Sequence, residues 1–177
     1  MRLPACLILP LMLLLLASCA SMSDKECRAG NWQAVGQRDG AEGYSASRLN
    51  DHAEACGEFR IVPDSVAYER GRSQGLVSYC QPLVGRSKGV DGASYNNVCS
   101  GPAEVGFLRG HAVGRQIHDL KKLQDTNTKR RKELTDQLAK KETKDDEIKR
   151  IKRDLERLDL DDRRLQRLVE QAYQIPL

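Results

Sequence analysis

Hydrophobic and polar residues follow three different patterns along the 177-residue chain. A short apolar run, residues 7–16, follows Arg2 near the N-terminus. Residues 19–118 carry local helix signals and no convincing period-2 pattern of the kind that predicts a strand. Residues 119–172 contain 17 basic and 14 acidic side chains, no Gly, Pro or Cys, and apolar residues at heptad spacing. These patterns predict an all-α protein with a small helical head and a long, charged C-terminal helix or helical hairpin.

Start and stop signals divide the head into short helices. The predicted N-caps are Asn31 for a turn that ends at Asp39-Gly40, Ser45 or Ser47 for a helix that ends at Cys56, and Asp64 for a helix over residues 65–79. Gly57 is expected to end the second of these helices as a left-handed cap residue, and Pro82 to follow the third. Three glycines within residues 85–92 predict a loop, and Gly101-Pro102 begins the next helix.

The charged tail, residues 119–177, has the composition of a helix. Acid-to-base pairs at four-residue spacing recur, for example Asp125 with Lys129 and Asp159 with Arg163, and each contributes tenths of a kcal/mol to helix formation. Heptad positions are apolar at both ends of the tail and mostly polar in the middle. Two topologies fit. One is a continuous helix that pairs in a coiled-coil oligomer, and the other is an antiparallel hairpin that turns near residues 141–146, with Thr143 as a cap.

The apolar run near the N-terminus is too short to cross a bilayer and has the layout of a secretory signal. It ends in Leu16-Ala17-Ser18-Cys19, which resembles the bacterial lipobox and implies cleavage after Ser18 and lipidation of Cys19. An ordinary signal cleaved after Ala20 is the alternative. The domains expected are a signal peptide over 1–18, a head over 19–118 and an extension over 119–177. Since no Asp follows Cys19, the resemblance implies an outer-membrane lipoprotein that faces the periplasm.

Four cysteines remain in the head once Cys19 is lipidated: Cys27, Cys56, Cys80 and Cys99. An even number of cysteines in a small exported domain predicts two disulfides, because a core of about 100 residues is thin and the compartment is oxidising. Four cysteines allow three pairings. The sequence-local choice joins Cys27 to Cys56 and Cys80 to Cys99.

An aromatic residue followed by two glycines four apart occurs three times in the head. The sets are Trp32 with Gly36 and Gly40, Tyr68 with Gly71 and Gly75, and Phe107 with Gly110 and Gly114. Glycine costs a helix roughly 0.5–1 kcal/mol relative to alanine, so paired glycines need compensation. The preferred interpretation is tight helix packing sealed by the aromatic rings. The other interpretation is a ligand groove with Arg70, Arg72, Arg109 and Arg115 at its edge for an anion.

Other chemistry finds little support in the sequence. His52 and Cys56, four apart, suit zinc in spacing, but no second close pair completes a set of four ligands, so no metal or other cofactor is expected. His111 and His118 would share a helical face and are read as packing or surface residues. No catalytic motif is present, and no enzyme activity is expected. The mature charge of +3, from 28 basic and 25 acidic residues, is weak evidence for nucleic acid, and none is expected as a partner.

Four groups of residues in the head together carry a family resemblance: Trp32 with Gly36, Asp39 and Gly40; Tyr68-x-x-Gly71-x-x-x-Gly75 leading to Tyr79-Cys80; Gly85-x-x-x-Gly89 with Tyr95 and Cys99; and Phe107-x-x-Gly110. Through these groups the head resembles the bacterial lipoproteins labelled domain of unknown function 2799. The resemblance covers about residues 27–118 and implies a small envelope lipoprotein with a disulfide-bearing head. The family brings no catalytic residues to transfer, and the charged tail departs from its short members.

The sequence therefore favours a structural or interaction protein, held to the membrane by its lipid, whose residues 119–172 contact a partner or a second copy of the chain. A periplasmic binding module that takes a small anionic or cell-wall ligand in the glycine groove is the alternative.

Overall fold

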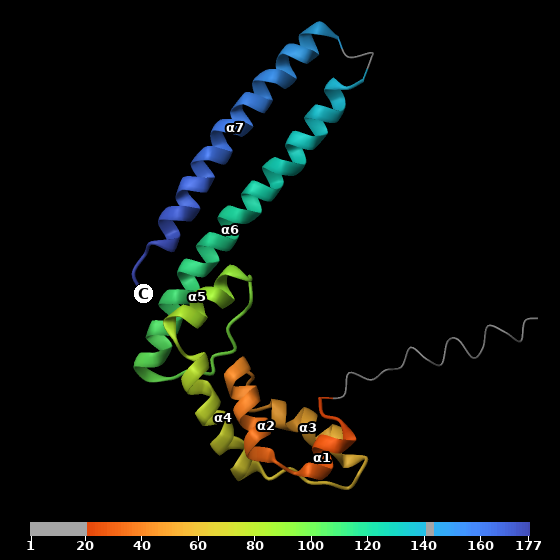
Figure 1. The fold of residues 1–177 in the computed structure, drawn as a ribbon, viewed down its shortest axis with the longest axis vertical. Coiled ribbons are helices and arrows are strands. Elements are labelled where there is room, and N and C mark those ends of the chain that lie inside the picture. Colours follow the sequence, from red (N-terminus) through yellow and green to blue (C-terminus); the bar gives the residue numbers. More distant parts are fainter. Residues whose placement is uncertain (1–20, 141–143) are drawn as a thin grey trace, which may run out of the picture.

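The computed structural model describes residues 21–140 and 144–177, and these residues form helices and no strand. In chain order the helices are α1 (Asp24–Ala29), α2 (Trp32–Glu42), α3 (Arg48–Gly57), α4 (Ser65–Tyr79), α5 (Pro82–Val90), α6 (Gly101–Leu138) and α7 (Asp145–Tyr173). Figure 1 shows an elongated molecule, with α1–α4 at one end and the α6–α7 hairpin extending from the other. The all-α prediction is confirmed.

Several predicted helix ends match the structure. The Asn31 side chain accepts a hydrogen bond from the Ala34 N–H at the start of α2, and Asp64 accepts from Val66 and Ala67 at the start of α4. Pro102 lies in the first turn of α6, where a missing N–H costs little.

Three local predictions were wrong. Helix α2 continues through Asp39-Gly40 and ends at Glu42, and Gly43 after it has the positive φ of a cap residue. Gly57 lies inside α3 and its φ is not positive. Most of the predicted loop over 85–92 is helix α5, in which Gly85 and Gly89 are buried. In α2 and α5, tertiary contacts of the glycines outweigh their low helix propensity.

Two pairs of helices make up the head, α2 with α4 and α5 with α6. In each pair the glycines of one helix meet residues of the other in increasing order along both helices, so the two helices are parallel. Parallel helices need a crossover connection. Residues 43–64, which include α3, supply it in the first pair, and residues 91–100 supply it in the second.

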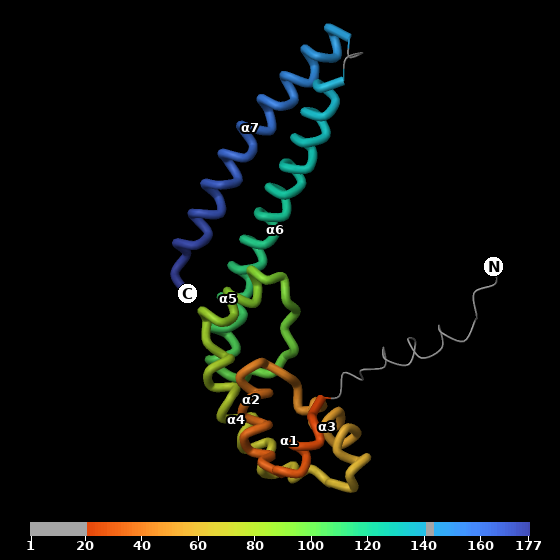
Figure 2. Tube along the Cα trace, turned by 45° about the vertical axis from the view of Figure 1, so that its right-hand side comes forward, coloured from red at the N-terminus to blue at the C-terminus, as the bar shows by residue number. Residues whose placement is uncertain are grey.

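Helix α6 belongs to both the head and the tail. It runs unbroken past residue 118, where the composition changes, and at about 1.5 Å per residue its 38 residues span about 57 Å. Helix α7 returns alongside α6, and the C-terminus lies beside α5 (Figures 1 and 2). Of the two predicted topologies, the structure forms the hairpin. The predicted cap Thr143 lies outside the described residues.

Candidate functional site

The glycines of α2 and α4 lie against each other's backbone. A methyl group at Gly36 or Gly40 would overlap the carbonyl oxygen of Tyr68 or Arg72. A methyl group at Gly71 or Gly75 would in turn overlap the carbonyl oxygen of Gln33 or Gln37. The contact is reciprocal, because each carbonyl belongs to the residue three positions before a glycine of the partner helix. This close approach permits weak Cα–H···O contacts and explains why side chains are excluded.

Helices α5 and α6 repeat this arrangement. Gly85 and Gly89 face the carbonyl oxygens of Phe107 and His111, while Gly110 and Gly114 face those of Pro82 and Arg86. Each of these carbonyl oxygens again belongs to the residue three positions before a glycine of the partner helix. The sequence interpretation placed the α5 glycines in a loop and not in a helix contact, although Pro82-x-x-Gly85-x-x-x-Gly89 has the same spacing as Tyr68-x-x-Gly71-x-x-x-Gly75.

The aromatic residues seal these helix pairs. Trp32 and Tyr68 are buried in one cluster with the first disulfide. Phe107 is buried between Tyr79 and Tyr95, with ring centroids 5.0 and 4.9 Å away. The predicted ligand groove is therefore wrong, because partner backbone fills the glycine faces and packed rings close their ends. The packing interpretation explains all three sets of residues.

The arginines expected at the edge of that groove are used elsewhere. Arg72 donates to the Tyr44 carbonyl and pairs with Glu69, and Arg115 donates to the Gly92 carbonyl. Both therefore fasten a crossover segment to its helix pair. Arg70 and Arg109 are exposed.

A buried polar network joins the start of the described chain to α2, α3 and α4. His52 Nε2 lies 2.7 Å from Asp39 Oδ2, and the Tyr68 hydroxyl donates to the same oxygen at 2.8 Å. The other ring nitrogen of His52 lies 2.8 Å from the Ser21 hydroxyl. Burial, followed by the hydrogen bond to Asp39, raises the pKa of Tyr68 well above its usual value. The network satisfies three buried polar side chains and fixes Ser21 against the head.

The histidine positions do not form a metal site. Cys56 is in a disulfide and both His52 nitrogens have hydrogen-bond partners, so this pair, whose spacing suits zinc, is engaged in other contacts. His111 and His118 each hydrogen-bond a backbone carbonyl, of Ala93 and Val90. In the described part of the chain, no group of three His, Cys, Asp or Glu side chains could hold a metal ion.

The disulfides join Cys27 to Cys56 and Cys80 to Cys99, the sequence-local pairs. Each bond ties a crossover segment back to the residues just before its own helix pair, since Cys27 lies in α1 ahead of α2 and Cys80 lies between α4 and α5. On the loop-entropy model, loops of this size stabilise the fold by about 3–4 kcal/mol each.

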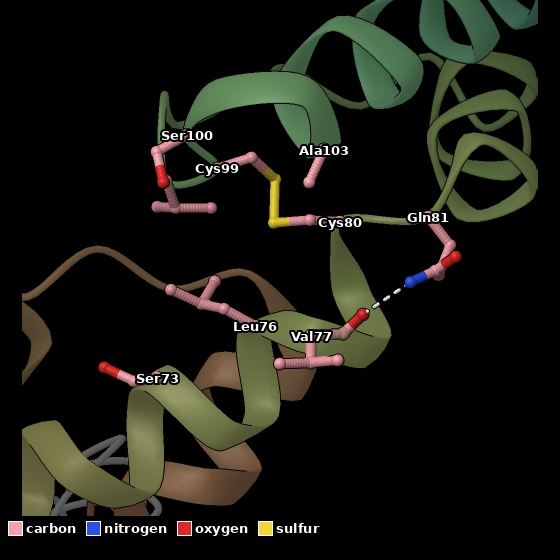
Figure 3. A pocket seen from close by; sticks show the side chains of 9 residues that line it. Ser73, Leu76, Val77, Cys80, Gln81, Cys99, Ser100 and Ala103 are labelled. Carbon is pink, nitrogen blue, oxygen red and sulfur yellow. Dashed lines mark hydrogen bonds between the residues drawn. A yellow bond between two sulfur atoms is a disulfide. The ribbon is translucent and has the colours of Figure 1, made fainter.

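Beside the second disulfide lies a surface depression of about 330 Å³ (Figure 3). Leu76, Val77 and Val98 contribute apolar side chains to it, and the Gln81 amide donates to the Val77 carbonyl at 2.7 Å. The charged side chains of the head do not line it, so it lacks the chemistry for the anionic ligand that the sequence suggested.

The hairpin is fastened both near the head and midway along its length. Near the head, Val169, Ala172 and Leu177 pack on Val113 and Ile117. Midway along, Arg131 of α6 pairs with Asp159 and Asp162 of α7, and Asn127 donates to Asp162 at 2.8 Å. This polar clamp accounts for Asn127 at one of the polar heptad positions in the middle of the tail.

Cys19, the predicted lipidation residue, lies outside the described residues, as do the signal segment and its flanks. Among residues 21–140 and 144–177, no helix has the length and apolar character needed to cross a bilayer.

Comparison with known proteins supports the resemblance noted in the sequence. A family model described as protein of unknown function, DUF2799, matches residues 31–116. No curated protein and no solved structure matches the chain. The matched segment contains α2, α4 and α5 and the part of α6 that carries Gly110 and Gly114. It ends inside α6, so the match does not cover the hairpin beyond residue 116. This chain, through the head formed by residues 31–116, belongs to the DUF2799 family.

Proposed function

We propose that this protein is a cell-envelope lipoprotein, held in the outer membrane through Cys19 and facing the periplasm, that presents its helical hairpin to a partner protein. The proposal assigns it no reaction and no cofactor. The lipobox resemblance supports the anchor. Two disulfides that close the head support an oxidising compartment.

One observation carries the interaction role: α6 is a single helix shared by the head and the hairpin. Its first half is locked against α5 through Gly110 and Gly114, and its second half projects from the head with α7. A hairpin fixed to the head in this way holds its outer surface at a fixed distance from the head. Apolar side chains on that surface, Leu123 and Leu160, are 53% and 60% exposed.

The test is photo-crosslinking in intact cells from two exposed apolar positions. A crosslinking residue at Leu160 reports on the hairpin, and one at Val62, which is 86% exposed in the head, is the matched control. The proposal predicts a discrete protein adduct from position 160 that is absent from position 62. Adducts from position 62 alone, or none from position 160, would contradict it.

The anchor is tested separately by cell fractionation. Cys19→Ser should release the chain from the membrane fraction, while Cys6→Ser, which removes a cysteine within the signal segment, should leave the mature chain membrane-bound. If both variants stay in the membrane fraction, the lipid anchor at Cys19 is contradicted.

A further inference from the structure

The side of α7 that faces away from α6 carries a continuous strip of cations. Ile151, 2% exposed, marks the side that faces α6. At 100° per residue, six basic residues fall within an arc of about 100° on the opposite side, and all are exposed. We call this strip the arginine face: Lys149, Arg150, Arg153, Arg157, Arg164 and Arg167, with Leu160 and Leu168 among them.

These cations are weakly paired within the chain. Arg150 and Arg157 lie 3.8 and 3.6 Å from Glu147 and Asp154, one helical turn away. The other four have no ion-pair partner among the described residues. No acidic residue between positions 149 and 171 falls in the same arc. The arginine face thus concentrates positive charge along about 27 Å of helix.

From this surface we infer that the arginine face binds an acidic, helical polypeptide segment of another protein, which lies along α7 as a third helix. The inference rests on the proposed function, since it names the class of partner that the hairpin takes. A contact of the same kind occurs within the chain. Arg131 of α6 already holds two aspartates of α7 across a helix–helix interface.

Three features favour a polypeptide over other anions. Guanidinium groups bind carboxylates in pairs of parallel hydrogen bonds, and five of the six cations are arginines. The exposed Leu160 and Leu168 can be buried against apolar side chains, which a peptide supplies and a polyphosphate does not. Acidic side chains border the face on both sides, Glu156 on one and Asp161 on the other. The cationic strip is therefore one helix wide, and the flanking carboxylates oppose contact with a flat anionic lipid surface, which would reach past the strip on both sides.

The arginine face of a second copy of the chain does not fit this face. Two arginine faces brought together would oppose six cations with six cations, which is unfavourable in either orientation. The partner must therefore carry the opposite charge.

The experiment measures binding of fluorescent probes to residues 19–177 carrying Cys19→Ser, with both disulfides formed. The first probe is poly-L-glutamate of about 30 residues. The second has the same length, with leucine at two positions eight apart to match Leu160 and Leu168. Polyphosphate of equal charge and anionic phospholipid vesicles are the competing probes. The inference predicts tightest binding of the leucine-containing peptide and loss of that preference in Leu160→Ser/Leu168→Ser.

Matched charge variants locate the site. Removing three cations of the arginine face (R153Q/R164Q/R167Q) should weaken peptide binding at least tenfold, since exposed ion pairs contribute up to about 1 kcal/mol each. Removing three exposed lysines from the opposite side of α6 (K122Q/K129Q/K132Q) changes net charge equally and should weaken it less than about twofold. Equal loss in both variants, or tighter binding of polyphosphate or vesicles, would overturn the inference. None of these outcomes depends on lipidation, so the binding assay tests the arginine face and cell fractionation tests the anchor independently of each other.

Discussion

Gly71 of α4 packs against the carbonyl oxygen of Gln33 in α2 so closely that a single methyl group would overlap it. Seven other glycines make equivalent contacts in the two helix pairs of the head, each with a carbonyl three positions before a glycine of the partner. The head is therefore held by backbone-to-backbone contact, supported by two disulfides, more than by a large apolar core. This arrangement suits a small domain, which buries too little apolar surface for a thick core.

Gly71→Ala should destabilise the head strongly. The added methyl group forces α2 and α4 apart, and we expect a loss of about 2 kcal/mol or more in the free energy of unfolding. Gly57→Ala is the matched control, because a methyl group there meets nothing within 4 Å in helix α3. That variant should gain about 0.5–1 kcal/mol through improved helix propensity. Chemical denaturation measures both, and equal stability of the two variants would refute the packing account.

Tyr68→Phe tests the buried polar network. The substitution removes the hydroxyl that donates to Asp39, and hydrogen bonds to charged groups contribute about 1.5–3 kcal/mol. Tyr79→Phe removes the hydroxyl of another buried tyrosine, whose pKa is raised by burial and not by a hydrogen bond to a carboxylate. Its loss should therefore lower the free energy of unfolding by less than about 0.5 kcal/mol. Thermal unfolding of the two variants gives the comparison. A larger loss for Tyr79→Phe would show that the Asp39 network contributes little.

Glu26 gives the head a pH-dependent contribution. Hydrogen bonds from the Ser23 backbone and hydroxyl, and then from Arg38, lower the Glu26 pKa from 4.5 to about 2. A carboxyl group whose pKa is lower in the folded state stabilises the fold above its unfolded pKa. The contribution is lost as pH falls from about 4.5 towards 2.

Glu26→Gln should therefore lower stability at pH 7 and leave it unchanged near pH 2. The carboxylate is 41% exposed, so solvent screening limits the loss to about 0.5–1 kcal/mol. Denaturation curves of both proteins across pH 2–7 should converge at the acidic end. Parallel curves would contradict the role given to this side chain.

Each disulfide should stabilise its own helix pair. Cys80→Ala/Cys99→Ala removes a crosslink that closes a loop of 19 residues, and we expect a loss of about 3 kcal/mol. Hydrogen exchange should increase most in α5 and the first half of α6. Uniform loss of protection across α2 and α4 would show that the two pairs do not respond separately.

The sequence predicts the helical class, the head–tail division in composition and the local cysteine pairs, because these depend on composition and on short-range spacing. It failed at residues 85–92, where glycine density predicts a loop and α5 is a helix. The contact that stabilises those glycines comes from α6, more than 20 residues away, and only the repeated spacing from Pro82 to Gly89 hinted at it.

The candidate site shows the same limit. Three aromatic–glycine sets were correctly identified, yet spacing alone fitted both a groove and a packed interface. Asp39, His52 and Tyr68 form one network through a crossover that no local pattern specifies. The arginine face emerges only when α6 fixes which side of α7 is turned outward.

The central claim is that an oxidised, lipid-anchored head supports the hairpin, and intact-mass analysis of the membrane fraction tests it most directly. The account predicts a chain that begins at Cys19, carries the added mass of a lipid, and gains four hydrogens when its two disulfides are reduced. An unlipidated chain with no change in mass on reduction would contradict it.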